Sequence, residues 1–389
     1  MRICFVVSQF APAIGGTESQ FRHLAAGLVA RGHSVEVLTR AVGGSRRRER
    51  MDGVPVTRAI RTVQAGPLFG LTYGLSVALG LAQRRGVDLF QVAFLHWDAA
   101  VAGWLRRFLG RPVIVRVANT GPGGDLDRLR GRYWPIFRSW DRPTIQALIR
   151  ATQRCDAFVV AVPHMAAALT REGFHPDRIV QIENGVDHRH FRPPTPEERA
   201  AARAALGLGQ ERMVMAVGRL DRLKGMGDLV SALPLLPQAT RLILVGDGAE
   251  REALRSRARA LGVGDRVHLT GWTTDVRSFL WAADAFALPS LTEGMPNALL
   301  EAMATGLPCV ATSVGAVADL LEGGAVGLLV QPDDPPDLAT ALRHALEEER
   351  AASRLGMAAR ARVEARHTLD EMLKRYEALY EGLACRGAG

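Results

Sequence analysis

Two glutamates eight positions apart frame the stretch of sequence best suited to chemistry. Glu293 and Glu301 stand in LTEGMPNALLEAMATGLPCVAT, residues 291–312, with Gly-Met-Pro-Asn directly after the first glutamate. Proline suits the first turn of a helix and Asn297 can cap one, so we expect a loop that ends in a helix start. Backbone N–H groups at such a start bind phosphate, and carboxylates accept hydrogen bonds from paired hydroxyl groups. The pattern predicts a nucleotide-sugar site, with the diphosphate between ribose and hexose, whereas two solvated glutamates on a helix are the simpler alternative.

A second cluster of suitable residues lies in AVGRLDRLKGMGDLV, directly after an apolar run. Arg219 and Lys224 would stand at the carboxyl end of a strand, beside the helix that begins near Gly225, where two cations can grip a diphosphate. Lys224 and Lys374 are the only lysines among 49 basic residues, so position 224 favours a compact ammonium over a planar guanidinium. Two solvated surface cations remain the alternative.

Two further loops have the composition of strand-to-helix turns. Gly15 and Gly16 in SQFAPAIGGTESQ precede Thr17 and Glu18, and paired glycines allow backbone N–H groups to approach an anion closely. The loop matches neither common nucleotide-binding glycine fingerprint, so a simple turn is the alternative. Asp247 in LVGDGAERE is expected only to cap a helix.

The elements that must position these loops alternate between apolar runs and amphipathic stretches. The runs ICFVV, SVEVL, DLFQVAFL, PVIVRV, DAFVVAV and RIVQIENGVD form one series, and MVMAVG, RLILVGDG, RVHLTG, AFALPS and PCVATS form another. Continuous Val, Ile and Leu runs indicate parallel strands covered on both faces. The sequence therefore predicts two doubly wound α/β domains, joined by a proline-rich linker at 189–211 and facing each other across a cleft. Ligands would bind beyond the carboxyl ends of the strands.

Composition narrows the class of protein without choosing a partner. The chain has 389 residues, a net charge of +9 and four widely spaced cysteines, which suits two soluble domains in a reducing compartment. The uncharged stretch 62–83 contains Gly and Pro, so we expect a buried or groove-facing helix, with an interfacial segment as the alternative. The basic stretch 43–50, GGSRRRER, is expected to be a solvated loop rather than a membrane patch.

The motifs GRLDRLKG, VGDG, IENGVD and ADAFALPSLTEGMPNALLEAMATGLPCVAT together resemble retaining glycosyltransferases of family 4. The resemblance covers nearly the whole chain and is strongest over residues 182–330. It implies the GT-B fold, with an acceptor-binding domain at 1–188 and a donor-binding domain at 189–366. It also implies a final helix, within 367–389, that packs back on the first domain.

The resemblance also implies roles for individual residues. Arg219 and Lys224 would bind the diphosphate and stabilise the leaving group, Glu301 would bind ribose, and Glu293 would hold the sugar. The other residues expected to contact the substrate, mostly through backbone, are Gly15, Gly16, Trp272, Gly294, Met295, Pro296, Asn297 and Leu300. No metal or cofactor is implied.

The chain departs from the family where many relatives carry a histidine after the fifth strand of the first domain. Ala118 and Asn119 stand at this point, and an asparagine can donate a hydrogen bond to a sugar hydroxyl but cannot act as acid or base. His96, after the run DLFQVAFL, is a candidate substitute, although a structural role is the simpler reading.

The expected reaction is transfer of a hexose from a UDP-, GDP- or ADP-sugar to an acceptor hydroxyl on a glycan, lipid or small molecule, with retention at the anomeric carbon. A nucleotide-sugar epimerase or a phosphorolytic enzyme of the same fold is one alternative. A non-catalytic protein that binds nucleotide sugars or nucleic acid is another, but aromatic residues are few for nucleic-acid binding. We expect a cytoplasmic protein, with peripheral contact to the inner face of the membrane as an option.

Overall fold

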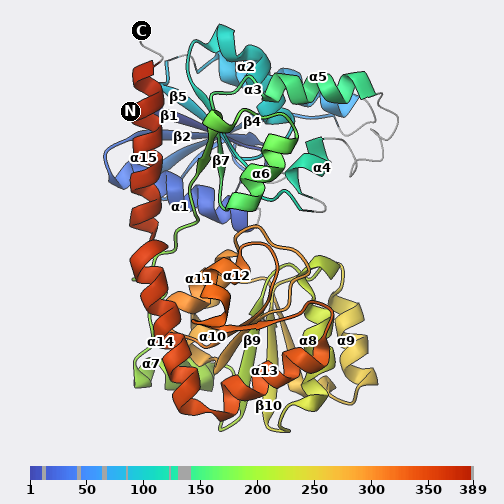
Figure 1. The fold of residues 1–389 in the computed structure, drawn as a ribbon. Coiled ribbons are helices and arrows are strands. Elements are labelled where there is room, and N and C mark those ends of the chain that lie inside the picture. Colours follow the sequence, from blue (N-terminus) through green and yellow to red (C-terminus); the bar gives the residue numbers. More distant parts are fainter. Residues whose placement is uncertain are drawn as a thin grey trace. The chain divides into compact units, whose positions relative to one another are not determined.

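The computed structural model describes residues 1–10, 15–41, 45–63, 68–84, 86–121, 124–129 and 142–386. The chain forms two compact units, each built on its own sheet (Figure 1). Unit 1 comprises Met1–Asn184 and Leu369–Gly389, and unit 2 comprises Gly185–Thr368.

The sheet of unit 1 has the order β3-β4-β2-β1-β5-β6-β7-β8, and all neighbours are parallel except β3 and β4. The central strands are buried apart from Arg2 at the start of the strand Arg2–Val7, as their continuous apolar runs predict. The strands are β1 Arg2–Val7, β2 Ser34–Arg40, β3 Arg48–Met51, β4 Val54–Ile60, β5 Leu89–Val92, β6 Val113–Arg116, β7 Ala157–Val160 and β8 Ile179–Gln181.

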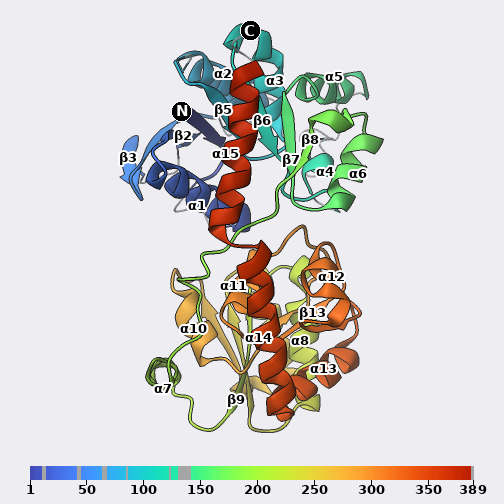
Figure 2. The ribbon, with the colours of Figure 1, turned by 60° about the vertical axis from the view of Figure 1, so that its left-hand side comes forward.

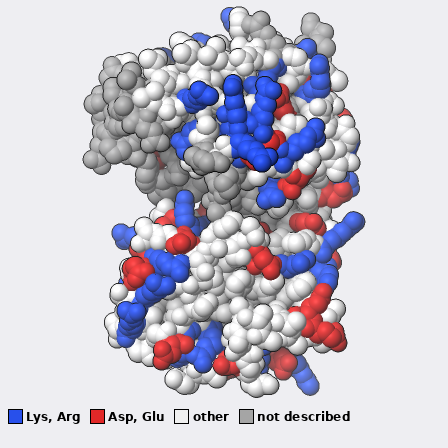
Figure 3. Space-filling model, turned by 180° about the vertical axis from the view of Figure 1, so that it is seen from behind, with Lys and Arg blue, Asp and Glu red and all other residues white. Residues whose placement is uncertain are grey.

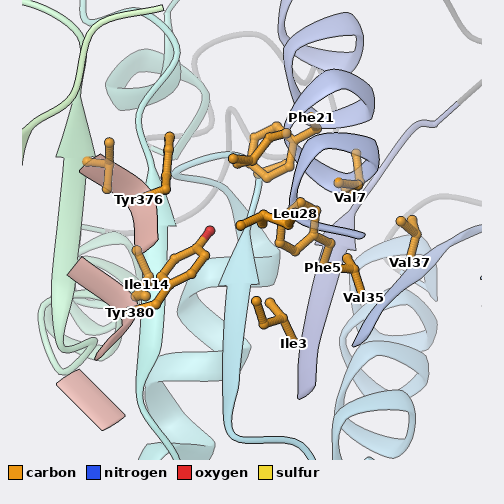
Figure 4. Packing of buried hydrophobic residues seen from close by; sticks show 14 of the residues in the cluster. Ile3, Phe5, Val7, Phe21, Leu28, Val35, Val37, Ile114, Tyr376 and Tyr380 are labelled. Carbon is orange, nitrogen blue, oxygen red and sulfur yellow. The ribbon is translucent and has the colours of Figure 1, made fainter. Parts of the chain in front are cut away.

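Helices pack on this sheet and close its core. Figure 4 shows Phe5 of β1 against Phe21 of the first helix, with ring centroids 5.4 Å apart in an edge-to-face arrangement. The helices of this part of the chain are α1 Gly16–Ala30, α2 Leu68–Ala82, α3 Trp97–Leu109, α4 Asp125–Leu129, α5 Arg142–Thr152 and α6 Pro163–Arg171.

The edge hairpin β3–β4 is absent from the sequence prediction. Asp52 and Gly53 form its turn with φ of 50° and 79°, the conformation that an Asp-Gly hairpin requires. The expectation of a solvated loop over 43–50 is therefore wrong for Arg48–Arg50, which pair with β4, while residues 43 and 44 lie outside the described residues.

The last helix, α15 (Leu369–Arg386), packs on unit 1, beside α1 (Figure 2). Tyr376 and Tyr380 are fully buried in the core of unit 1, and the Tyr380 hydroxyl lies 3.1 Å from Gln91 Oε1 on β5. Arg31, at the end of α1, binds both Asp370 and Glu377 of α15.

Unit 2 has a six-stranded parallel sheet of order β11-β10-β9-β12-β13-β14. The chain runs outward from β9 to β10 and β11, then returns to the other side of β9 as β12. The strand order therefore reverses between β9 and β12, the place where open α/β sheets bind ligands. The strands are β9 Arg212–Val217, β10 Thr240–Val245, β11 Val267–Gly271, β12 Ala285–Leu288, β13 Cys309–Thr312 and β14 Leu328–Val330.

Helices cover both faces of this second sheet. They are α7 Pro196–Ala205, α8 Met226–Ala232, α9 Arg251–Ala260, α10 Val276–Ala282, α11 Asn297–Ala304, α12 Val317–Leu320, α13 Pro335–Glu347 and α14 Glu349–Arg366. Short 3₁₀ turns link several elements, and η3 (Arg222–Lys224) precedes α8. Within the described ranges, no helix is both long and apolar enough to cross a membrane.

Candidate functional site

A lysine–glutamate pair spans the point of strand reversal in unit 2. Lys224 follows β9 and Glu293 follows β12, and Lys224 Nζ lies 2.6 Å from Glu293 Oε1. The lysine side chain is 24% exposed and the glutamate side chain 8%. The structure therefore brings together two residues that the sequence assigned to different parts of a donor, the diphosphate and the sugar.

Backbone contacts join the two loops that carry this pair. Leu291 N donates to Leu223 O at 2.8 Å. Gly225 has φ of 61°, and a Cβ added there would lie 1.9 Å from Pro289 O, so only glycine fits at this crossing. The positions of Lys224 and Glu293 are thus fixed by the main chain on both sides.

Glu293 has a second donor that the sequence reasoning did not assign. Ser290 is fully buried, and its Oγ donates to Glu293 Oε1 at 2.7 Å. Thr312 Oγ1, at the end of β13, donates in turn to Ser290 O, and a Cβ on Gly315 would lie 2.0 Å from Glu293 O. The sequence signal that could have indicated this hydrogen bond is the serine three residues before the glutamate.

Helix α11 begins after the Gly-Met-Pro turn, as expected, but its capping differs. Pro296 occupies the cap position and Asn297 is the first helical residue, so Asn297 is not the cap. Glu301 lies in the second turn of α11, and burial raises the pKa of its carboxyl to about 8.

Arg219 lies on the loop after β9, but its guanidinium is engaged locally. Arg219 Nε donates to Asp221 Oδ2 at 2.7 Å, and the arginine side chain is 65% exposed. The same loop contacts the turn after β10, where Leu220 N donates to Asp247 O. Asp247 Oδ1 accepts from Gly248 N, so it orders its own turn rather than the α9 cap.

The other residues that the sequence predicts to contact the nucleotide sugar differ in how exposed their side chains are. Trp272, directly after β11, is 49% exposed, whereas Met295 is buried and Leu300 is fully buried. Leu300 therefore presents no side chain to a ligand. Gly294 O accepts from Ala316 N, which ties the turn to the loop after β13.

In unit 1, polar groups gather where β5 and β6 end. His96 Nε2 lies 3.3 Å from Asp125 Oδ1, and Asp125 Oδ2 accepts from Ala118 N at 2.7 Å. Asn119 Oδ1 accepts from Gly121 N at 2.8 Å, which leaves the amide nitrogen as its outward donor. Asp125 thus links the candidate substitute His96 to the loop that carries Asn119.

The paired glycines begin α1 as the sequence predicts. Gly15 is the cap residue in an extended conformation, and Ser19 N donates to its carbonyl at 3.0 Å. A Cβ at Gly15 would lie 2.1 Å from the Glu18 carboxylate. Residues 11–14, just before, lie outside the described residues. In the part of the chain that is described, no three His, Cys, Asp or Glu side chains cluster as metal ligands.

Two α/β units, each built on a largely parallel sheet, define a fold that solved structures share. Sucrose-phosphate synthase from Thermosynechococcus elongatus superimposes with a TM-score of 0.83, at 25% identity over 99% of both chains. HepE from Anabaena, solved with UDP and glucose, gives 0.82 at 21% identity, over 98% of this chain and 100% of HepE. The protein has the GT-B fold of glycosyltransferases.

Sequence comparison carries the assignment further. Residues 14–190 match the family described as Glycosyltransferase Family 4, and residues 211–348 match Glycosyl transferases group 1. D-inositol 3-phosphate glycosyltransferase of Xylanimonas cellulosilytica is 30% identical over 372 residues, which are 89% of this chain and 87% of the relative. The chain belongs to glycosyltransferase family 4.

Proposed function

We propose that the protein transfers a hexose from a nucleoside diphosphate sugar to an acceptor hydroxyl, with retention at the anomeric carbon. The observation that carries the proposal is the Lys224–Glu293 pair at the strand reversal of unit 2. The Anabaena HepE structure with UDP and glucose supports a nucleotide-sugar donor, and a UDP-sugar is the first donor to test.

The pair is suited to the boundary between diphosphate and sugar. One Nζ hydrogen of Lys224 is used on Glu293, which leaves two donors for phosphate oxygens. Both contacts of Glu293 reach Oε1, so Oε2 can accept from a sugar hydroxyl. As the glycosidic bond breaks, the leaving diphosphate gains negative charge, which a fixed ammonium stabilises.

The other residues that would bind the nucleotide sugar lie around the Lys224–Glu293 pair in this proposal. Arg219 would leave Asp221 to bind the diphosphate, and the amides at the start of α11 would face the same phosphates. Glu301 would accept hydrogen bonds from the ribose hydroxyls. No carboxylate is assigned as a covalent nucleophile, so we favour attack of the acceptor on the same face that the leaving phosphate departs from, with that phosphate taking the acceptor proton.

We assign the acceptor to unit 1. Asn119 would donate to a hydroxyl of the transferring sugar, and His96, whose Nε2 lies 3.3 Å from Asp125 Oδ1, would contact the acceptor. The Gly15–Gly16 turn would approach the distal phosphate. The enzyme would act in the cytoplasm, in part at the inner face of the membrane, on a glycan, lipid or small-molecule acceptor.

Slow donor hydrolysis without acceptor tests the proposal. The full-length protein is incubated with UDP-, GDP- and ADP-glucose, and release of nucleoside diphosphate is measured. We expect one donor to be cleaved and both Lys224→Ala and Glu293→Ala to abolish cleavage. NMR of the first-formed sugar then reports retention or inversion.

The chain offers matched controls for both charges. Lys374, the other lysine, forms an exposed pair with Asp370, and Glu252 forms an exposed pair with Arg255. Lys374→Ala and Glu252→Ala should keep full activity. Full activity in the folded Lys224→Ala and Glu293→Ala variants would overturn the site. An epimerised donor in place of free diphosphate would overturn the reaction.

A further inference from the structure

Exposed apolar side chains gather on two neighbouring helices of unit 1. Of the eleven large hydrophobic side chains found exposed in the described part of the chain, five lie on α2 and α3. They are Leu71, Leu75 and Leu79 of α2, 69%, 60% and 55% exposed, and Trp104 and Phe108 of α3, 75% and 61% exposed. We call these five residues the α2–α3 surface. The sequence predicts a buried or groove-facing helix over 62–83, and burial is wrong for this outer face.

The α2–α3 surface has a defined shape, because buried contacts between the two helices hold them in place beneath the exposed side chains. The leucines recur every four residues, so they form one stripe, as do Trp104 and Phe108 on α3. Figures 1 and 2 both show α2 and α3 side by side. Tyr73 of α2 and Asp98 of α3 are both buried beneath this surface, and a Cβ at Gly74 of α2 would lie 3.6 Å from Val101 of α3, an ordinary packing distance.

The opposite face of α2 already fills the core. Tyr73, Val77 and Leu81 are buried, so the exposed leucines are not needed for folding. An apolar stripe of this kind on a soluble protein marks a contact surface.

Positive charge borders the α2–α3 surface. Residues 53–124 contain two carboxylates: Asp98 is fully buried, and Asp88 accepts from Arg2 N and forms an ion pair with the Arg2 side chain. Arg61, just before α2, and Arg107, on α3, are both exposed. Further arginines, 46–48 and 50, are exposed along the edge hairpin next to the strand that α2 covers, and Figure 3 shows basic side chains gathered on one face of unit 1.

We propose that the α2–α3 surface docks on the surface of an anionic lipid bilayer. Leucines and a tryptophan suit the boundary between headgroups and acyl chains, and the bordering arginines suit anionic headgroups. A second copy of the chain is a poorer occupant, because face-to-face contact would bring two arginine borders together.

The docked surface would serve the acceptor side of the proposed reaction. The helices α2 and α3 begin at the sheet edge where the parallel strands end, and His96 is the cap residue of α3. A lipid-linked acceptor would therefore approach the edge that carries His96. This step rests on the proposed function, whereas lipid binding itself does not, so the two can fail separately.

Vesicle sedimentation tests the docking. Full-length protein is mixed with vesicles of phosphatidylcholine alone or of equal parts phosphatidylcholine and phosphatidylglycerol. We expect partition onto the anionic vesicles only, weakened when salt rises from about 50 to about 500 mM. The triple variant Leu71→Gln, Leu75→Gln, Leu79→Gln should partition at least about 100-fold more weakly.

A charge variant separates the electrostatic contribution to vesicle binding from the contribution of the apolar side chains. One arginine near an anionic surface is worth a factor of about five, so Arg61→Gln with Arg107→Gln should weaken partition about 25-fold. The matched charge control is Arg343→Gln with Arg354→Gln, two exposed arginines of unit 2, which should leave partition unchanged.

The apolar control removes exposed hydrophobic side chains elsewhere. Leu235, Leu261 and Met357 of unit 2 are 50%, 42% and 62% exposed, and their triple replacement by Gln should leave partition unchanged. Thermal unfolding checks that every variant is folded. Equal partition of the two triple variants would overturn the proposal. So would sedimentation equilibrium that shows a dimer which the α2 variant converts to a monomer.

Discussion

Replacement of Lys224 by methionine should separate the structural from the chemical role of the Lys224–Glu293 pair. The Nζ–Oε1 distance is 2.6 Å, and the side chains are 24% and 8% exposed. Exposed pairs are worth about 0.2–1 kcal/mol, and breaking a fully buried pair costs about 3–5 kcal/mol. This pair lies between those limits, so Lys224→Met should lower the free energy of unfolding of unit 2 by about 2 kcal/mol. The reason is that, among the described residues, it leaves the Glu293 carboxylate with Ser290 as its side-chain hydrogen-bond donor.

Differential scanning calorimetry of the full chain measures the effect. For a unit of this size each kcal/mol shifts Tm by about 2–4 °C, so Lys224→Met should lower the unit 2 transition by about 4–8 °C. Glu293→Gln should cost less, because the lysine left behind can turn to water. In the double variant Lys224→Met, Glu293→Gln no buried charge remains unpaired, and the stability loss should be smaller than the sum of the single losses.

Activity should behave differently from stability. The double variant recovers stability but has no cation at the diphosphate, so donor hydrolysis should stay at least about 100-fold below wild type in all three variants. Lys374→Met is the control, and its exposed pair with Asp370 should change Tm by no more than about 1–2 °C. The energetic coupling between Lys224 and Glu293 would be refuted if Lys224→Met lost no more stability than Lys374→Met. It would also be refuted if the stability losses of the two single variants simply added in the double variant.

Three further predictions concern residues around this pair. Because the pKa of Glu301 is raised to about 8, the folded protein binds an extra proton between pH 4.5 and 8, and stability should fall with rising pH in that window. If ribose binds the carboxylate, titration calorimetry with an intact nucleotide sugar should show affinity rising by up to about 50-fold from pH 6 to 8, and Glu301→Gln should remove the trend. Gly225→Ala should lose more stability on thermal unfolding than Gly262→Ala, since both have positive φ but nothing lies within 4 Å of a Cβ at Gly262; equal losses would mean that the close approach costs nothing. Ser290→Ala should slow donor hydrolysis about tenfold in the wild-type background and have no further effect beside Glu293→Ala, whereas independent effects would show that Ser290 does not act through Glu293.

The parallel strands were predictable because a strand that is buried on both faces appears in the sequence as a continuous apolar run. The run at Arg2–Val7 is apolar almost throughout and is flanked by two parallel neighbours. The edge strand Arg48–Met51 has no such apolar run. None of its four residues is buried, and three of them are charged. The Asp52–Gly53 turn was its one readable signal.

Helix α2 shows a related limit. The segment 68–82 carries no charged residue, so its apolar side chains give no periodicity from which a buried and an exposed face can be distinguished. Uniform hydrophobicity then favours burial. The exposure of Leu71 became visible only when the neighbouring helix and sheet were placed.

The sequence suggested residues for the candidate site one by one but not their arrangement. Lys224 and Glu293 are 69 positions apart, and their contact depends on β9 and β12 being neighbours. Strand order is a property of the whole sheet, so local spacing does not reveal it. The partner of Arg219, two residues away at Asp221, lay within local reach and was still missed, because a solvated cation needs no partner.

The glycines around the pair explain why the site can act without rearrangement of its main chain. A Cβ at Gly246 would lie 1.9 Å from Gly218 O, and one at Gly315 would lie 2.0 Å from Glu293 O. Each crossing locks a donor loop to its neighbour at a distance that no other residue allows. Stabilisation of a leaving group depends on charges already in place when the bond breaks, since moving them then would cost part of the gain. Because the main chain beside Glu293 is braced in this way and its carboxylate already holds Lys224, the proposed function would find the ammonium in place before the donor binds. Arg219, which is exposed and bound to Asp221, would in the same proposal be the cation that has to move.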